Sequence, residues 1–335
     1  MKKLRIGAIG LGLLGAAQVT TVARSVAVGE LVAVSDFDLG RAREIADSLP
    51  GDVRVIASAE ELIAADDVDA VLIASSASSH LELVLACIEN RKPVFCEKPL
   101  ALTGADCEQI LDAEIDAGRQ LVQVGFMRRY DAAFVDLKSA VATGDLGDIV
   151  ALQYVHRAAD VPESFTSSMH TTEAVVHEVD TTRWLIDDEI VEVRVEGTGG
   201  RSGLEEWLDP QFFYFRTAGG AMVYAEVFLR AGYGYEIGCE VVGRNGTARL
   251  TNAPSTSVSL GFRTSGGREK DYTVRFADAY RGELAGWAED AINGVVNGPN
   301  SWDGYAGAAV TDACLEALRT GEPVAVKMRP RPSFY

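Results

Sequence analysis

The chain begins with short apolar runs separated by stretches with helical spacing. Continuous apolar runs at 4–9, 30–36, 53–57, 69–75 and 120–125, and one that ends in Glu97, predict strands. The intervening stretches, from Ala16 onward and at 40–48, 59–65 and 81–90, predict helices. Strands that are apolar throughout and alternate with helices form a parallel sheet covered on both faces. The pattern therefore predicts a doubly wound Rossmann domain over residues 1–124.

The pattern changes near 123–126, where the last strand of the parallel type ends. Strand-like segments follow at 148–158, 189–199, 210–218, 221–231 and 235–250. Gly219-Gly220 and Asn245-Gly246 are hairpin signals between them. Helical spacing returns at 283–295 and 306–318. Residues 125–335 are thus predicted to form a second domain.

Composition and charge narrow the possible partners. A chain of 335 residues suits two domains, and 47% hydrophobic with 24% charged residues is ordinary for a globular protein. The formal net charge of -18 repels phosphate backbones and anionic membrane surfaces, so neither nucleic acid nor membrane is an expected partner. The apolar run at the N-terminus is short and interrupted by glycines, which predicts a strand and not a signal peptide.

The five cysteines are widely spaced and odd in number, and none belongs to a Cys-x-x-Cys pair. They are Cys87, Cys96, Cys107, Cys239 and Cys314. This distribution argues against a disulfide framework or a zinc site and predicts a reducing, cytoplasmic location.

A glycine-rich loop follows the first predicted strand. Gly10, Gly12 and Gly15 have the Gly-x-Gly-x-x-Gly spacing of a dinucleotide-binding turn, and Leu13 and Leu14 are expected beside the cofactor with them. The second strand ends in Asp36, whose carboxylate can accept hydrogen bonds from the adenosine ribose and would repel the extra phosphate of NADP. We therefore expect NAD as the cofactor; Asp36 could instead simply end the strand or cap the next helix.

Two further strand ends carry polar residues. Ser75 and Ser76 follow one strand at its carboxyl end, where ligands of such sheets bind. His80 is expected at the start of the next helix, where it either has a structural role or contacts the ligand. Glu97, Lys98 and Pro99 follow another strand. There a lysine can donate to a substrate hydroxyl and stabilise an alkoxide, although a surface pair with Glu97 is the ordinary alternative.

These motifs resemble those of the Gfo/Idh/MocA family of oxidoreductases, whose Glu-Lys-Pro signature corresponds to "CEKP" here. The segments "VQVGFMRRYDAAF", "VHR", "VHEVDTTRWL", "YGYEIGCEVVGRNG" and "WDGYAGAAVTDAC" are similar to the inositol 2-dehydrogenases of that family. The resemblance runs from Gly7 to about Leu318. It implies a C-terminal α/β domain with an open, mostly antiparallel sheet, and assembly as a homotetramer through that sheet.

Glu173, His177 and Asp180 fall at i, i+4 and i+7, which would place them on one face of a helix. A metal site is not expected, because no second histidine completes His-Glu-x-x-His, whereas a solvated charged face is the ordinary alternative. A histidine with a pKa near 6.5 suits a general base. The resemblance implies His177 as that base, with Glu173 and Lys98 completing the catalytic set and Asp180 orienting the substrate or a helix neighbour.

The resemblance also implies a substrate pocket lined by Met127, His156, Tyr235 and Tyr280. The chain departs from the inositol pattern at Glu173, Ala174 and Ala158, where relatives usually carry Asp, a hydroxyl residue and Asn. We expect an NAD-dependent dehydrogenase that oxidises a secondary hydroxyl of a cyclic polyol or sugar to a ketone. The alternatives are the same reaction on an open sugar, an anhydrosugar or a glycoside, and a catalytically silent NAD-binding sensor.

Overall fold

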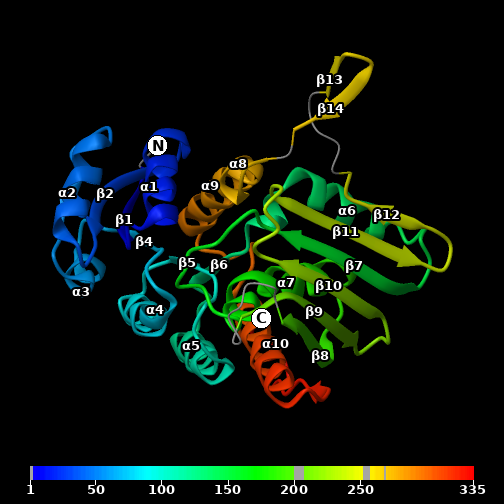
Figure 1. Cartoon of the computed structure of the whole chain (residues 1–335). Coiled ribbons are helices and arrows are strands. Elements are labelled where there is room, and N and C mark those ends of the chain that lie inside the picture. The colour runs from blue at the N-terminus through cyan, green and yellow to red at the C-terminus, as the bar shows by residue number, and fades with distance from the viewer. Residues whose placement is uncertain (1–2, 200–206, 252–256, 268) are drawn as a thin grey trace. The chain divides into compact units, whose positions relative to one another are not determined.

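The apolar runs of the first third form one six-stranded parallel sheet (Figure 1). The computed structural model describes residues 3–199, 207–251, 257–267 and 269–335. The strand order is β3-β2-β1-β4-β5-β6. Strands β2 and β3 lie on one side of β1 and strands β4 to β6 on the other, so the strand order reverses between β1 and β4, as in a doubly wound fold. The strands are β1 Leu4–Ile9, β2 Gly29–Ser35, β3 Arg54–Val55, β4 Ala70–Ile73, β5 Val94–Glu97 and β6 Val122–Gly125.

Helices cover both faces of this sheet, as predicted. Helices α1, α2 and α9 share a core with one face, while Leu62 of α3 lies against Gly7 on the other. The helices are α1 Leu13–Ser25, α2 Leu39–Ser48, α3 Ala59–Ala64, α4 His80–Glu89, α5 Gly104–Ala117 and α9 Ala277–Asn293, with a 3-10 turn, η1, at Ala77–Ser79.

This first compact unit is discontinuous in sequence. It contains the described residues up to Met127 together with Asp278–Ala308 and Arg329–Tyr335. Trp287 of α9 packs against Phe95 of β5 with ring centroids 5.7 Å apart, and the Tyr335 hydroxyl donates to Glu114 Oε2 at 2.8 Å. A single division between residues 124 and 125 therefore leaves out segments that return to the first unit.

The second unit, Arg128–Ala277 with Ala309–Met328, is built on a seven-stranded sheet. Its order is β12-β11-β7-β10-β9-β8-β15, and all described neighbours pair antiparallel except β7 and β10. The mostly antiparallel sheet is thus confirmed. The strands are β7 Ile149–Arg157, β8 Ile190–Gly199, β9 Leu208–Thr217, β10 Met222–Phe228, β11 Glu236–Gly243, β12 Thr247–Arg249 and β15 Val324–Ala325.

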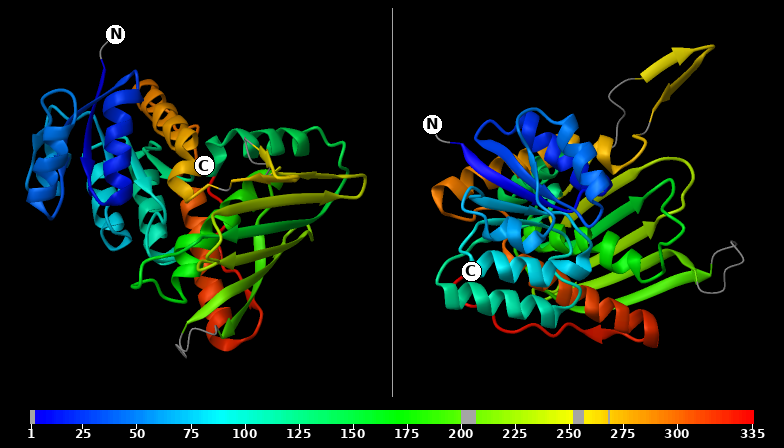
Figure 2. Two further views of the ribbon diagram at one scale, coloured as in Figure 1. Left: turned by 45° about the horizontal axis from the view of Figure 1, so that its top comes forward. Right: turned by 90° about the vertical axis from the view of Figure 1, so that its left-hand side faces the viewer.

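Both predicted hairpin turns are present in this sheet. Gly220, with φ of 91°, lies between β9 and β10, and Gly243 N donates to Gly246 O between β11 and β12. A further hairpin, which the sequence pattern did not predict, pairs β13 Ser257–Leu260 with β14 Arg263–Gly266 (Figure 2).

The helix expected to contain Glu173, His177 and Asp180 has two parts. A π-helical stretch, η3, occupies His170–Val175, and the α-helix α7 continues over Val176–Ile186. His170 begins the π-helical stretch and contacts Asp209 of β9 at 3.0 Å, which ties this end of the segment to the sheet. The remaining helical elements among the described residues are η2 Met127–Tyr130, α6 Ala132–Ala142, α8 Tyr272–Arg275 and α10 Ser301–Thr320.

Candidate functional site

The three glycines of the first loop have different surroundings. A Cβ on Gly10, whose φ is 87°, would lie 2.4 Å from Ser75 N, and one on Gly15 would lie 2.1 Å from Gly10 O. A Cβ on Gly12 would meet nothing within 4 Å. Gly10 and Gly15 are therefore needed for close packing of the loop, while Gly12 leaves the N-terminal end of the 13-residue helix α1 open.

Asp36 follows β2 and is held by backbone groups of two loops. Its Oδ2 accepts a hydrogen bond from Leu11 N at 2.7 Å, and its Oδ1 accepts one from Asp38 N at 2.8 Å. The carboxylate is thus fixed beside the glycine loop. An open helix N-terminus suits a pyrophosphate, and an oriented carboxylate suits ribose hydroxyls, so these residues fit NAD.

The loop after β4 contains the predicted Ser75, Ser76 and His80. Ser75 Oγ and Ser79 Oγ lie 2.7 Å apart, and Ser76 Oγ lies 3.1 Å from Ser78 Oγ. The ring of His80 is buried, with Nδ1 2.8 Å from Pro99 O and Nε2 3.2 Å from Ser75 O. These contacts favour the structural role for His80, because the ring connects this loop with the turn at Lys98-Pro99.

That turn is supported by the buried carboxylate of Glu97. Lys98 N donates to Glu97 Oε2 at 3.1 Å, and Gln18 Nε2 donates to Glu97 Oε1 at 2.5 Å. Lys98 follows the carboxyl end of β5 directly, as predicted. Burial and the neighbouring Glu97 raise the pKa of Glu283 on α9 well above its ordinary value. Glu283 was not anticipated from the sequence.

In the second unit, Glu173 belongs to the π-helical stretch, whereas His177 and Asp180 belong to α7. Glu173 is half-buried and His177 is 7% exposed. The carboxylate of Asp180 is buried and forms a double contact with Arg129, at 3.1 Å to Nε and 2.5 Å to Nη2. Of the two roles considered for Asp180, this contact favours the orientation of a neighbouring side chain.

A second buried ion pair lies beside the predicted pocket residue His156. Glu178 of α7 accepts from Arg128 Nη1 at 2.6 Å, and His156 Nδ1 of β7 lies 3.2 Å from Glu178 Oε1. Burial would raise the pKa of Glu178, but the charges of Arg128 and His156 lower it to about 2. Arg128 and Glu178 were missed as site residues, although the run "FMRRYD" places two arginines directly after an apolar strand.

The remaining predicted pocket residues divide between the two units. Met127 and Tyr280 belong to the first unit, and Met127 is buried. Tyr235 belongs to the second, where its ring meets that of His156 edge-on with centroids 6.2 Å apart. Ala174 is buried in the π-helical stretch.

Within the described part of the chain, no group of three or more His, Cys, Asp or Glu side chains is arranged to hold a metal ion. None of the described helices has the length and apolar character needed to cross a membrane.

Comparison with known proteins agrees with this arrangement. Residues 4–126 match the model of the oxidoreductase family with an NAD-binding Rossmann fold, and residues 138–326 match that of its C-terminal alpha/beta domain. Inositol 2-dehydrogenase 1 of Saccharopolyspora erythraea is 44% identical, with 99% of each chain covered. Inositol 2-dehydrogenase of Serratia proteamaculans is 40% identical, again over 99% of each.

A solved structure is similar over the same length. It is that of myo-inositol dehydrogenase from Lactobacillus casei in complex with NAD(H) and myo-inositol, with a TM-score of 0.96, 29% identity and 99% of each chain covered. The two family models together span most of the sequence. The protein thus belongs to the Gfo/Idh/MocA family of NAD-binding oxidoreductases.

Proposed function

We propose that this protein is an NAD-dependent dehydrogenase that oxidises one secondary hydroxyl of an inositol-like cyclic polyol or sugar to a ketone. The observation that carries the proposal is similarity to inositol 2-dehydrogenases over the full chain, in a sequence that has Lys98 after β5 and His177 in α7. Residues 1–124 are proposed to bind NAD, and residues 125–335 to bind substrate and mediate oligomerisation.

The glycine loop and Asp36 would hold NAD, together with Leu13, Leu14, Ser75, Ser76 and the Glu97-Lys98 turn. When bound, NAD supplies the acceptor for the hydride that leaves the substrate carbon. His177 accepts the hydroxyl proton as a general base, and Lys98 stabilises the negative charge that develops on the oxygen. Glu173 orients the imidazole or a substrate hydroxyl.

The substrate need not be myo-inositol. Ala158 and Ala174 provide no side-chain hydrogen bonds, and Glu173 is one methylene longer than the usual aspartate. A hydroxyl buried without its partner costs about 1–3 kcal/mol, so these positions favour a ligand with fewer or differently placed hydroxyls. An anhydrosugar, an open sugar or a glycoside is therefore the second candidate.

The test is NADH formation with a panel of inositols, pyranoses and glycosides. We expect at least one of them to be oxidised, and we expect His177→Ala and Lys98→Met each to lower kcat by about 10²–10⁴-fold. Glu196→Gln, on the half-exposed surface of β8, is the matched control and should retain full activity. Failure of every substrate would favour the NAD-binding sensor, and full activity of His177→Ala would remove the proposed base.

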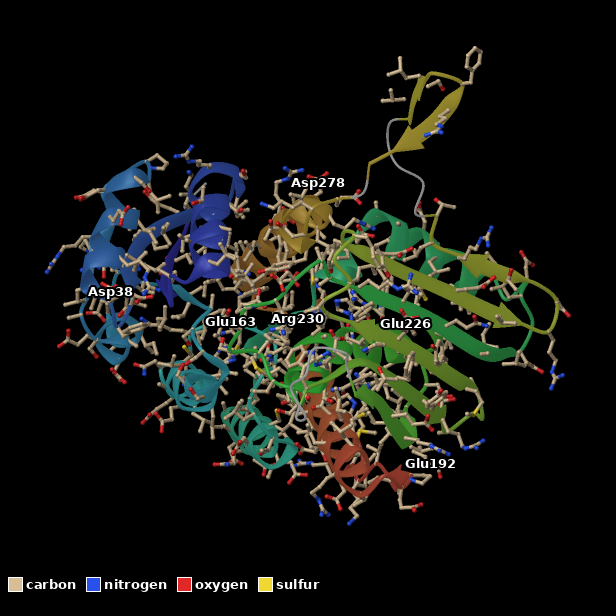
Figure 3. The ribbon with its side chains drawn as sticks, viewed as in Figure 1. Asp38, Glu163, Glu192, Glu226, Arg230 and Asp278 are labelled. Atoms are coloured by element: carbon tan, nitrogen blue, oxygen red, sulfur yellow. The ribbon has the colours of Figure 1, made fainter. Side chains whose placement is uncertain are left out.

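We further propose a homotetramer assembled through the second sheet. Phe212 stacks near Tyr224 with centroids 6.3 Å apart, and both side chains remain partly exposed beside Tyr214. Glu226, labelled in Figure 3, and Glu236 flank Arg157 in the same sheet with contacts of 2.6 and 3.0 Å. A partly apolar sheet surface with its charges already paired is suited to burial against a second copy.

Sedimentation velocity tests the assembly. The wild-type protein should sediment as a tetramer, and Tyr224→Glu should dissociate it, because an unpaired carboxylate would be placed in the interface. A monomeric wild type would exclude the proposal. The five cysteines are all free and buried, which supports the proposed cytoplasmic location.

A further inference from the structure

We propose that Glu97 and Glu283 form a buried pair of carboxyl groups that holds a single proton, and that Glu283 carries this proton so that Glu97 can hold the turn at Lys98. Glu283 is then a positioning residue, which acts on Lys98 through Glu97. The inference rests on the proposed function in taking Lys98 as a catalytic residue, whereas the proton on Glu283 is a property of the first unit alone.

Both carboxyl groups lie in the interior of the first unit. Glu283 of α9 has no exposed surface, and Glu97 at the end of β5 is 5% exposed. The two elements belong to the same compact unit. Water cannot solvate a charge in either position, so each ionised carboxylate would need hydrogen-bond donors from the protein.

The packing of α9 on β5 brings the two side chains together. Trp287 packs against Phe95 with ring centroids 5.7 Å apart. Glu283 lies four residues before Trp287 in α9, a distance of about 6 Å along the helix axis. Glu97 lies two residues after Phe95 on the same face of β5, about 6.6 Å along the strand. The two steps match, so Glu283 faces Glu97 in the way that Trp287 faces Phe95.

The two carboxyl groups differ in the donors that they meet. Gln18 Nε2 of α1 donates to Glu97 Oε1 at 2.5 Å. Lys98 N donates to Glu97 Oε2 at 3.1 Å. No donor among the described residues reaches either oxygen of Glu283. Because donors stabilise the ionised form of a carboxyl group, Glu97 holds the charge of the pair and Glu283 holds the proton.

The surroundings of the pair disfavour a second negative charge. Burial and the charge of Glu97 both raise the pKa of Glu283, and the neighbouring Gln18 of α1 is a neutral amide. On the side of β6, Glu97 is paired with Gly125, where a Cβ would lie 3.0 Å from three atoms of the Glu97 carboxyl group. Glu97 therefore has little room to move away from a charged Glu283, and neighbouring carboxyl groups of this kind share one proton.

The proton on Glu283 consequently protects the contact between Glu97 and Lys98. When alkaline solution removes this proton, repulsion between the two carboxylates weakens the hydrogen bond that Glu97 accepts from Lys98 N. A displacement of a catalytic group by about 1 Å can cost about 10²-fold in rate. The wild type should therefore lose activity at a pH at which a neutral side chain at position 283 has no such effect.

Infrared spectroscopy can detect the proton directly. The sample is the full-length protein with NAD bound, at neutral pH, and Glu283→Leu is the reference because leucine adds no carbonyl group. We expect the difference spectrum to contain the carbonyl band of a protonated carboxyl group, and we expect this band to disappear from the wild type at alkaline pH. Absence of the band at neutral pH would overturn the inference.

Kinetics test the effect on Lys98. The kcat at saturating NAD and polyol should be measured from neutral to alkaline pH for the wild type, Glu283→Gln and Glu283→Leu. We expect the ratio of variant to wild-type kcat to rise at least about tenfold over this range. Glu289→Gln, at an exposed position of the same helix, is the matched control, and its ratio should stay constant.

The dependence on pH separates a positioning role from a merely structural one. A structural role would change kcat by the same factor at every pH, so a constant ratio for the Glu283 variants would reject the inference. If no polyol is oxidised at all, the proposed function fails. The infrared band, and the same ratio measured on the dissociation constant of NADH by fluorescence, then still decide whether Glu283 carries the proton and supports the turn.

Discussion

Glu283 is a carboxyl group with no exposed surface, and neither of its oxygens has a hydrogen-bond partner among the described residues. Burial first, and then the charge of Glu97, raise its pKa well above the ordinary value. It therefore binds a proton in the folded chain at a pH where the unfolded chain has released it. Such a group costs stability as the pH rises.

We predict that Glu283→Gln stabilises the protein at neutral pH. In the wild type, the free energy of unfolding should fall as the pH rises above 4.5, by up to about 1.4 kcal/mol per pH unit until the folded-state pKa is passed. The glutamine variant lacks this contribution. Urea unfolding of both proteins should be measured at intervals of about one pH unit between pH 5 and pH 8. The difference between their free energies of unfolding should widen as the pH rises. A difference that stays constant would contradict the prediction.

Asp36 gives the second prediction at the scale of single residues. Asp36→Asn should raise the dissociation constant of NAD about tenfold, because the carboxylate accepts hydrogen bonds from the ribose hydroxyls. The preference for NAD over NADP should also become smaller, because the carboxylate repels the extra phosphate of NADP. Asp38→Asn is the control. Asp38, labelled in Figure 3, caps α2 by accepting from Gly40 N and Arg41 N. Asparagine keeps the accepting oxygen, so Asp38→Asn should change neither the stability of the fold nor the affinity for NAD appreciably.

Within the candidate site, the sequence could predict single residues that directly follow a strand. Asp36 and Lys98 were predicted at their observed positions after β2 and β5, because strand ends are visible in the apolar pattern. Arg128 and Glu178 were not found, because their pairing depends on packing between segments that are 50 residues apart. A buried ion pair leaves no periodic signal.

At the scale of elements, the glycine loop shows how one motif serves both folding and binding. Gly10→Ala forces a Cβ against Ser75 at positive φ and should destabilise the fold by about 1–3 kcal/mol. Gly12→Ala meets nothing within 4 Å and should leave the unfolding free energy unchanged while weakening NAD binding. Thermal melts and NAD titrations of both variants separate the two effects; an unstable Gly12→Ala would disprove this division.

The helix that contains His177 shows the limit of periodicity. A repeat near 3.6 residues predicted one helix with Glu173, His177 and Asp180 on a shared face. The π-helical stretch His170–Val175 has a different repeat, so Glu173 leaves that register. The contact of His170 with Asp209, which ties the stretch to the sheet, joins residues 39 apart and is invisible in a local pattern.

At the scale of the whole molecule, the return of the chain to the first unit matters most. The Tyr335 hydroxyl donates to the fully buried Glu114, which also accepts from Val122 N at 2.9 Å. We predict that Tyr335→Phe lowers the free energy of unfolding by about 1.5–3 kcal/mol, the range for a hydrogen bond to a charged group. Tyr233→Phe, at a side chain that is 54% exposed, should have almost no effect in the same denaturation experiment.

The alternation of strands and helices was sufficient to predict the parallel sheet, because an apolar strand is recognisable from its own residues. The mostly antiparallel sheet was implied by the family resemblance, and the strand-like segments with their hairpin signals agreed with it. It was not sufficient to assign α9 and the C-terminal residues to the first unit. Their apolar faces look alike whichever sheet they cover, and long-range contacts, such as those of Trp287 with Phe95 and of Tyr335 with Glu114, are needed to identify the partner.

The discontinuous first unit also has a consequence for biosynthesis. A ribosome releases the six parallel strands early, yet the helix that contributes Leu284 and Trp287 to their core is translated only near the end of the message. Until then, the nascent sheet presents apolar surface to chaperones. A premature stop codon before Ala277 would remove this helix and therefore impair the sheet that was synthesised first.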